Sequence, residues 1–402
     1  MTAMYISHIR LENIRGFREL EINLSGKDGP RLRTVIIGKN GTCKTSVLRA
    51  IALGLCDLTD ANALISEPIG EVIRSRSMEG RITVELKARE EWTLLTSTLR
   101  QESGKEQVSQ SSSGSYVLRP FVCGYGAGRF GVGSDSGREY RIADAVYTLF
   151  DYHRTLIHPE LTLRRLQDFL GSERYEAAIA GIKRALGLTR EDEIRLPQGG
   201  GVEISGPSLG KSVRLEGWAD GYRMTFSWMV DLYGRAMRAD RITPAGHVKG
   251  ILLIDELEQH LHPSMQAEIL PRITEAFPEV QLFATTHSPL VALDAKPEEL
   301  VVLRREGDLV VREEAVPDFT GYSAEDMLVD ERLFDTDVYS PEMREKVTRY
   351  RELAAIPKEA RDYEQTRSLR SLAFEIQGRP VPESRQDQMM QELKRLVDKH
   401  GL

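Results

Sequence analysis

Apolar and polar residues alternate at the start of the chain, as they do along a half-buried strand. The alternation covers 7–12, breaks at Gly16 and resumes over 20–24, which predicts a strand hairpin. A short apolar run at 33–37 predicts a buried strand, and the apolar residues of 47–55 have the spacing of a helix. We therefore expect a strand, a glycine-rich loop and a helix in succession, the order found in phosphate-binding sites.

Strand-like and helix-like patterns then alternate along the chain. Two strand-like runs fill 81–100, and the serine-rich stretch 109–115 is typical of a flexible loop tip. Residues 142–188 have helical spacing and predict an inserted helical lobe. Further along, the pattern predicts a helix at 221–237, a strand at 250–254, a helix at 263–273, a strand at 280–286 and a hairpin over 301–311.

Composition changes this picture mainly by exclusion. The chain has 402 residues, 41% hydrophobic and 29% charged, enough for two or three lobes with full cores. Its net charge of -7 excludes an overall basic coat for nucleic acid, so any contact with DNA requires a local patch. No apolar run approaches the ~20 residues of a membrane helix, and we expect no membrane contact and a cytoplasmic location. Three separated cysteines exclude a disulfide framework and a four-cysteine zinc site.

A phosphate-binding loop is the strongest chemical signal. Residues 38–45 match the pattern G-x-x-x-x-G-K-[ST] at every fixed position except Cys43. In such a loop the backbone N–H groups cradle the phosphates of ATP, Lys44 neutralises the β and γ oxygens, and the Thr45 hydroxyl is a ligand of Mg²⁺. A tight turn without a ligand is the alternative, which the strand-to-helix setting disfavours. The residues expected at ATP are Gly38, Lys39, Asn40, Gly41, Thr42, Cys43, Lys44, Thr45 and Ser46.

Cys43 stands where glycine is usual. Its side chain is small, so we expect the cradle to survive. The alternative is a redox-sensitive thiol, activated by Lys44 and the helix N-terminus and protected by bound ATP.

A second half of an ATP site is predicted much further along the chain. The apolar run 251–254 ends in Asp255 and Glu256. Asp255 is expected to hold Mg²⁺ through water, and Glu256 to orient or deprotonate the attacking water. His287 follows the next predicted strand and is the candidate sensor of the γ-phosphate. A buried strand with acidic residues at its exposed end is the alternative, which the phosphate loop makes the weaker one.

With these three motifs in order, the chain resembles the ABC-type ATPase heads of the RecF and structural-maintenance-of-chromosomes group. Within that group it is most similar to the ATPases of overcoming-lysogenization-defect and Septu-like phage-defence proteins. The resemblance covers about residues 4–330, and its marks are 9–17, 255–263 and 285–289. It implies an α/β fold of the ABC-type P-loop class, a mixed sheet with flanking helices. It also implies a head-to-tail homodimer, extended in some cases to a higher oligomer, that encloses ATP and Mg²⁺ between two heads.

The resemblance further implies a signature segment that reaches the partner's nucleotide. Here it is 218–223, with Ala219 in place of the family's serine, so we expect Asp220, Gly221 and Tyr222 to face a phosphate. An ordinary helix cap formed by Asp220 is the alternative. The lobe-coupling loop falls at 121–129 and lacks the family's glutamine, and Arg129 is a candidate for a phosphate contact.

Four segments result. They are 1–141, a first ATPase lobe with the phosphate loop; 142–217, a helical insert and connector; 218–330, the half with the signature helix, Asp255 and His287; and 331–402, a charged helical extension. The extension is expected to end in a helix over 385–399 and either to contact partners or to cap the head. No long coiled-coil arm and no fused nuclease pattern is expected. His260 and His262 favour turn packing over a metal site.

Three functions compete at this stage. The leading one is an ATPase that senses or gates a separate effector, such as an HNH nuclease encoded nearby, in antiviral defence or DNA surveillance. The second is a RecF-like repair ATPase that clamps duplex DNA. The arginines that could supply its basic surface are Arg10, Arg15, Arg18, Arg31 and Arg33, or Arg74 and Arg76 with Arg81. The third is a scaffold that ATP holds together with little turnover, toward which Cys43 and Ala219 both point.

Overall fold

A computed structural model describes residues 4–26, 29–66, 70–114, 119–129, 131–133, 139–207, 212–336, 339–357 and 360–377. The chain separates into two compact units, residues 1–317 and 318–402. The predicted boundary nearest to this one, at 330/331, lies within the second unit. The two units are described one at a time.

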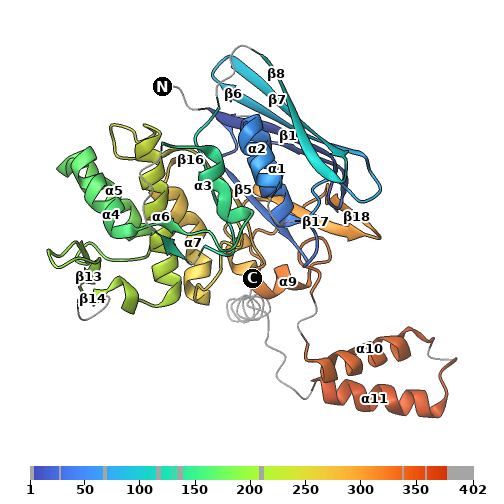
Figure 1. Ribbon diagram of the computed structural model, residues 1–402. Helices are drawn as coiled ribbons and strands as arrows, with labels where there is room; N and C mark the ends of the chain where they lie inside the picture. Colours follow the sequence, from blue (N-terminus) through green and yellow to red (C-terminus); the bar gives the residue numbers. More distant parts are fainter. Residues whose placement is uncertain are drawn as a thin grey trace. The chain divides into compact units, whose positions relative to one another are not determined.

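A six-stranded sheet carries both halves of the predicted ATP site (Figure 1). Five of its strands are parallel and only the hairpin partner β18 is antiparallel. Because the register pairs Ile36 with Thr285, and Ile254 with Tyr125, these strands end at one edge. The strands, in sheet order, are β18 (Leu309–Arg312), β17 (Leu300–Glu306), β5 (Arg33–Gly38), β16 (Glu279–Thr285), β15 (Lys249–Ile254) and β9 (Val122–Tyr125).

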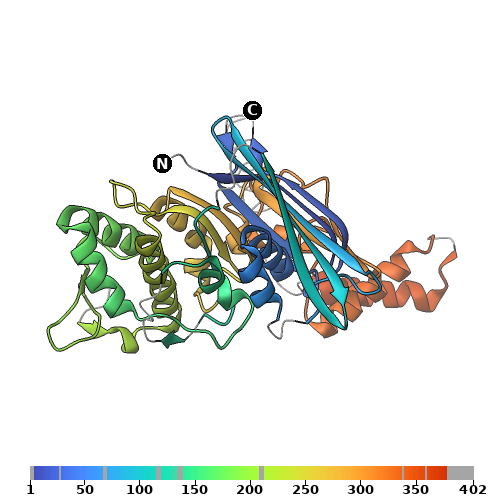
Figure 2. The same cartoon turned by 45° about the horizontal axis from the view of Figure 1, so that its top comes forward.

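A second, antiparallel sheet packs over the phosphate-loop helix. That helix, α1 (Lys44–Leu55), lies between the two sheets and buries its apolar residues toward both (Figures 1 and 2). A β-carbon on Gly54 would lie 2.8 Å from Val84, so the helix approaches the sheet closely there. The predicted opening hairpin is confirmed as the first two strands. In sheet order the strands are β2 (Phe17–Asn23), β1 (Tyr5–Ile14), β6 (Glu79–Ala88), β7 (Glu91–Glu102) and β8 (Lys105–Gly114).

The prediction of a loop tip at 109–115 was wrong. Residues up to Gly114 belong to β8, which pairs with β7 from Glu102 and Lys105 to Thr93 and Gly114. The strand lies at the edge of the sheet and most of its side chains are exposed. An edge strand of this kind needs no apolar alternation, which is why its serines resemble a loop.

A group of helices packs beside the six-stranded sheet, next to β9 and β15. Residues 142–188 are largely helical, as their spacing predicted. The longest helix of the group, α6, buries Phe226, Trp228 and Tyr233 in the core. The helices of this part are α3 (Ile142–Val146), α4 (Pro159–Leu170), α5 (Ser172–Ala185), α6 (Asp220–Arg238) and α7 (Pro263–Ala276). Shorter elements are α2 (Leu58–Ile65), α8 (Pro289–Ala292) and the small strands β10 to β14 between 132 and 214.

The second unit is helical where it is described. It contains α9 (Ala324–Val329), α10 (Pro341–Ala355) and α11 (Tyr363–Gln377), and the last two pack against each other. The predicted final helix, 385–399, lies outside the described residues. Among the residues that are described, no helix has the length and apolarity to span a membrane.

Candidate nucleotide site

The phosphate loop is folded around the ammonium group of Lys44. Lys44 Nζ donates to the carbonyl oxygens of Gly38, at 2.8 Å, and Lys39, at 3.2 Å. Gly38 has a φ of 153°, and a β-carbon there would lie 2.4 Å from the Leu303 carbonyl oxygen, so only glycine fits. Burial lowers the pKa of Lys44 to about 8. The ammonium group of Lys44 is therefore hydrogen-bonded to backbone carbonyl oxygens of the loop and not to a carboxylate.

Cys43 occupies this loop in a left-handed conformation. Its φ is 62°, in the region where a β-carbon costs about 1–2 kcal/mol. Backbone conformation, not the width of the cradle, is therefore the reason for the usual glycine. The Cys43 Sγ atom lies 4.0 Å from the Gly41 carbonyl oxygen and is partly buried against the core. The loop accommodates Cys43 in this conformation, and a working phosphate cradle stays a prediction.

The two predicted metal ligands lie next to each other. Thr45 Oγ1 donates to both carboxylate oxygens of Asp255, at 3.0 and 2.9 Å. Thr285 Oγ1 donates to Asp255 Oδ1 at 2.6 Å, and the Asp255 side chain is almost wholly buried. A hydroxyl and a carboxylate are hard oxygen donors of the type that Mg²⁺ takes when phosphates and water complete its shell. The residues present therefore fit Mg²⁺ bound together with a nucleotide.

Glu256 follows Asp255 on a turn that is held from two sides. Its φ is 48°, and its N–H donates to Thr285 Oγ1 at 2.8 Å. Arg129 donates to the carbonyl oxygens of Asp255, at 2.6 Å, and Glu256, at 2.9 Å. Burial and the neighbouring charge of Asp255 raise the pKa of Glu256. A raised pKa brings a carboxylate closer to the range in which a general base works at neutral pH.

Arg129 does not have the role predicted for it. Its guanidinium is 3% exposed and also donates to the Gly126 carbonyl oxygen at 3.0 Å. These contacts tie the loop after β9 to the turn that carries Glu256. The residue positions the carboxylate, and its hydrogen bonds to three carbonyl oxygens replace the expected contact with phosphate.

His287 lies at the end of β16, as predicted, and its backbone is fixed by a residue that the sequence did not single out. Glu258 accepts from His287 N and from Thr286 Oγ1, both at 2.6 Å. Burial and the nearby charge of Lys44 lower the pKa of His287, which favours the neutral imidazole. The place of Glu258, two residues after the catalytic candidate, is the signal that could have identified it.

The predicted signature segment opens α6 beside the loop that follows Glu256. A β-carbon on Gly221 would lie 2.4 Å from the His260 carbonyl oxygen, so the helix start and that loop are in close contact. Asp220 lies in the first turn and accepts from Arg223 at 2.7 Å; it is not the helix cap of the alternative interpretation. His262 Nδ1 accepts from Ser264 N at the start of α7, the turn-packing role expected of it.

Family models match both halves of this site. The model described as "AAA ATPase domain" matches residues 4–92, and the one described as "AAA domain, putative AbiEii toxin, Type IV TA system" matches residues 228–294. Septu protein PtuA of Bacillus mycoides is 26% identical over 359 residues, which cover 88% of this chain and 48% of that protein. The chain thus spans about half the length of this relative.

Shorter and structural likenesses were also found. The Retron Ec83 probable ATPase of Escherichia coli is 55% identical over 42 residues, 10% of this chain and 8% of that protein. A solved SMC head bound to the C-winged helix domain of ScpA covers 77% of this chain and 97% of its own, with a TM-score of 0.48 and 15% identity. The SMC head domain from Thermotoga maritima aligns with a TM-score of 0.45 and 13% identity, over 77% of this chain and 99% of its own.

Proposed function

Because the chain carries an ATPase head of the type found in Septu protein PtuA, we propose that it binds and hydrolyses Mg-ATP to gate a separate effector in defence against phage. The single observation that carries the proposal is the joint placement of Lys44, Thr45, Asp255 and Glu256 at one sheet edge. A phosphate cradle, a metal pair and a carboxylate with a raised pKa are the three parts that phosphoryl transfer to water requires.

The residues divide the work as follows. The loop from Gly38 to Ser46 cradles the phosphates, and Lys44 exchanges its carbonyl partners for phosphate oxygens. Mg²⁺, when bound at Thr45 and Asp255, supplies positive charge for the phosphate oxygens. Glu256 accepts a proton from the attacking water, and His287 as a neutral imidazole donates a hydrogen bond to the γ-phosphate.

A second copy of the chain completes the site in this proposal. The N-terminus of α6, at Asp220, Gly221 and Tyr222, faces the nucleotide of the partner head in a head-to-tail homodimer, as the family resemblance implies. The effector is a separate protein, and the resemblance to Septu-like systems favours an HNH nuclease. The second unit is the part proposed to contact partners or to build larger assemblies.

The RecF-like alternative finds less support. Among the arginines offered for a DNA patch, three have carboxylate partners within their own unit: Arg10 pairs with Glu19, Arg33 with Glu299 and Arg81 with Glu79. Paired guanidinium groups leave little surplus charge for a phosphate backbone.

Mg-ATP turnover at increasing protein concentration tests the proposal, with no DNA or partner added. Turnover is expected to rise faster than linearly with concentration, because the complete site needs two heads. Glu256→Gln is expected to bind ATP but lower kcat about 100-fold or more, the usual loss of a general base. The exposed Glu275→Gln on α7 is the matched control and retains turnover. If the wild-type protein binds ATP without turnover, the ATPase proposal is wrong and a nucleotide-gated scaffold is the better assignment.

A further inference from the structure

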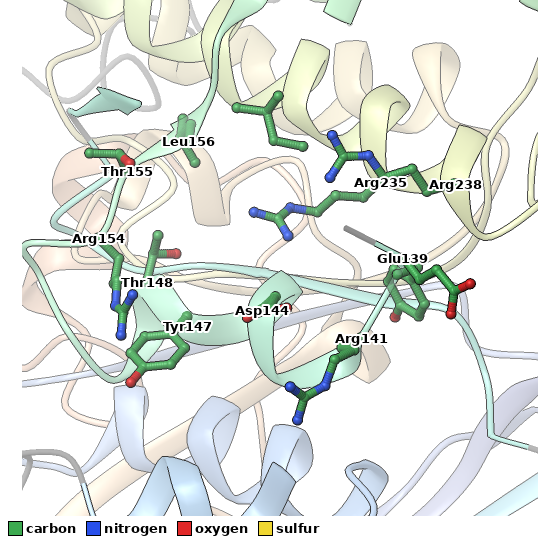
Figure 3. A pocket seen from close by; sticks show the side chains of 12 residues that line it. Glu139, Arg141, Asp144, Tyr147, Thr148, Arg154, Thr155, Leu156, Arg235 and Arg238 are labelled. Carbon is green, nitrogen blue, oxygen red and sulfur yellow. The ribbon is translucent and has the colours of Figure 1, made fainter. Parts of the chain in front are cut away.

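A second cavity lies in the first unit and shares no lining residue with the nucleotide site. It has a volume of about 260 Å³ and lies between α3 and the C-terminal half of α6 (Figure 3). Four arginines line it: Arg235 and Arg238 from α6, Arg141 at the start of α3, and Arg154 from the segment before β11 (Leu156–Ile157). Two carboxylates, Glu139 and Asp144, line it as well. Nothing described so far uses this concentration of guanidinium groups.

Arg235 is fixed by a buried carboxylate that accepts three hydrogen bonds. Asp231 is wholly buried and accepts from Arg235 Nε at 2.6 Å, Tyr125 Oη at 2.8 Å and Ile157 N at 2.8 Å. The hydrogen bond from Nε to Asp231 fixes the guanidinium of Arg235, and the side chain lines the cavity with 12% of its surface exposed.

Arg154 faces the same space but is half exposed. Its Nε lies 3.5 Å from Asp151, and its guanidinium stacks 3.9 Å over the ring of Tyr147. Its terminal NH₂ groups have no acceptor among the described residues. Figure 3 shows Arg154 on the side of the cavity opposite to Arg235 and Arg238. Two rigid forks of donors thus face one cavity from opposite walls.

The arginines of the cavity repel one another, and an anionic ligand would reduce this repulsion. Burial lowers the pKa of Arg238, and the neighbouring positive charge of Arg235 lowers it further. Arg141 is paired with Asp60, so the carboxylates available inside the cavity are those of Glu139 and Asp144. Like charges gathered at a cavity wall are a feature of sites for anions.

We propose that this cavity binds a phosphate-bearing small molecule of about the size of a nucleoside monophosphate, with its phosphate between Arg235 and Arg154. Planar guanidinium forks match the oxygens of a phosphate two at a time. The volume exceeds what a bare phosphate needs and lies just below the range of about 300–1,000 Å³ for drug-sized ligands. The Tyr147 ring and the wall of Leu156 provide apolar surface for the rest of the ligand. The proposal stands independently of hydrolysis at the phosphate loop.

Calorimetric titration of the full chain with AMP and with inorganic phosphate tests this site. The background is Lys44→Ala, which removes the ammonium group that binds phosphate in the first site. AMP is expected to bind this protein, and Arg235→Lys and Arg154→Gln are each expected to weaken its binding by about tenfold or more, the value of a charge-assisted hydrogen bond. Arg235→Lys keeps the positive charge at Asp231, and Arg154 is half exposed, so both proteins retain their fold.

The controls separate this cavity from other sources of phosphate binding. Arg195→Gln removes an exposed arginine that pairs with Glu193 outside the cavity and is expected to leave AMP binding unchanged. Loss of AMP binding in Lys44→Ala would overturn the proposal. An AMP affinity that is unchanged in both Arg235→Lys and Arg154→Gln would also overturn it, because the ligand would then bind elsewhere. Inorganic phosphate that binds as tightly as AMP would show a site for the free anion and overturn the assignment of ligand size.

Discussion

Lys44 is held in the loop by two carbonyl oxygens, and its proton is bound weakly for a lysine. In the empty protein its pKa is about 8, lowered by burial from an ordinary value near 10.5. Phosphate oxygens bind the protonated amine better than the neutral one. Nucleotide binding to a molecule with a neutral Lys44 is therefore coupled to the uptake of a proton from the solvent. The unfolded chain binds this proton more tightly than the folded one, so the contribution of Lys44 to the free energy of unfolding rises between about pH 8 and pH 10.5.

This proton predicts that Mg-ATP affinity depends on pH. Between pH 7 and pH 9 the protonated fraction of a group with a pKa of about 8 falls about tenfold. We therefore expect the dissociation constant to rise about tenfold over that range, with proton uptake in calorimetry above pH 8. Lys44→Arg, which stays protonated, is the matched variant and is expected to lose this dependence even where its affinity is lower. A flat profile in the wild-type protein would contradict the prediction.

For single residues, the sequence predicted which side chains meet at the nucleotide site better than it predicted backbone torsions. Lys44, Thr45 and Asp255 meet because their motifs follow β5 and β15, two parallel strands that lie on either side of β16 in one sheet. The left-handed φ of Cys43 was not foreseen, because a pattern records that glycine is missing without saying which torsion required it. Arg129 was misplaced for a related reason, since the same guanidinium donors can bond to carbonyl oxygens as well as to phosphates.

Among the elements, α6 has the most constrained beginning. Its first turn lies against the loop after Glu256, where the Gly221 backbone and the His260 carbonyl group leave no room for a side chain. The helix and that loop therefore move together or not at all. An element of this kind was predictable as a helix from its spacing. The edge strand β8 was not, because its partly buried face carries the polar Glu106 and Gln110 and so lacks the apolar alternation that identifies strands.

Gly221→Ala is expected to destabilise the chain by about 1–3 kcal/mol, the usual cost of overpacking. The added β-carbon would meet a backbone oxygen at 2.4 Å, and a backbone atom cannot rotate away as a side chain can. Chemical denaturation followed by tryptophan fluorescence measures the loss. Gly199→Ala, where a β-carbon would meet no atom within 4 Å, is the control. Equal stability of both variants would mean that the helix start yields without cost.

In the first unit, one amide side chain joins the two sheets. Gln281, on β16, accepts from Ile6 N at 2.7 Å and donates to the carbonyl oxygens of Ile6 and Arg31, both at 2.9 Å. The side chain is 2% exposed, so neither water nor another residue can replace it. The segments matched by the two family models, 4–92 and 228–294, are therefore parts of one folded unit.

Gln281→Met is expected to lower the free energy of unfolding of this unit by about 2–5 kcal/mol. Methionine has nearly the same volume, but three backbone groups then lose their partner, at about 1–3 kcal/mol each before relaxation. Urea denaturation provides the measurement, and Gln107→Met on the exposed face of β8 is the control. A change below about 0.5 kcal/mol would contradict the structural role assigned to the amide.

The pairing of strands that are distant in the sequence limits the order in which the six-stranded sheet can form. Strand β5, which leads into the phosphate loop, pairs on both sides with strands that begin at residues 279 and 300. At a synthesis rate of about 5–20 residues per second, these partners leave the ribosome roughly 12–50 s after β5 does. During that interval β5 has neither of its strand partners. Slow folding through long-range contacts follows, and recombinant yield is expected to improve when growth is cooled or when chaperones are abundant.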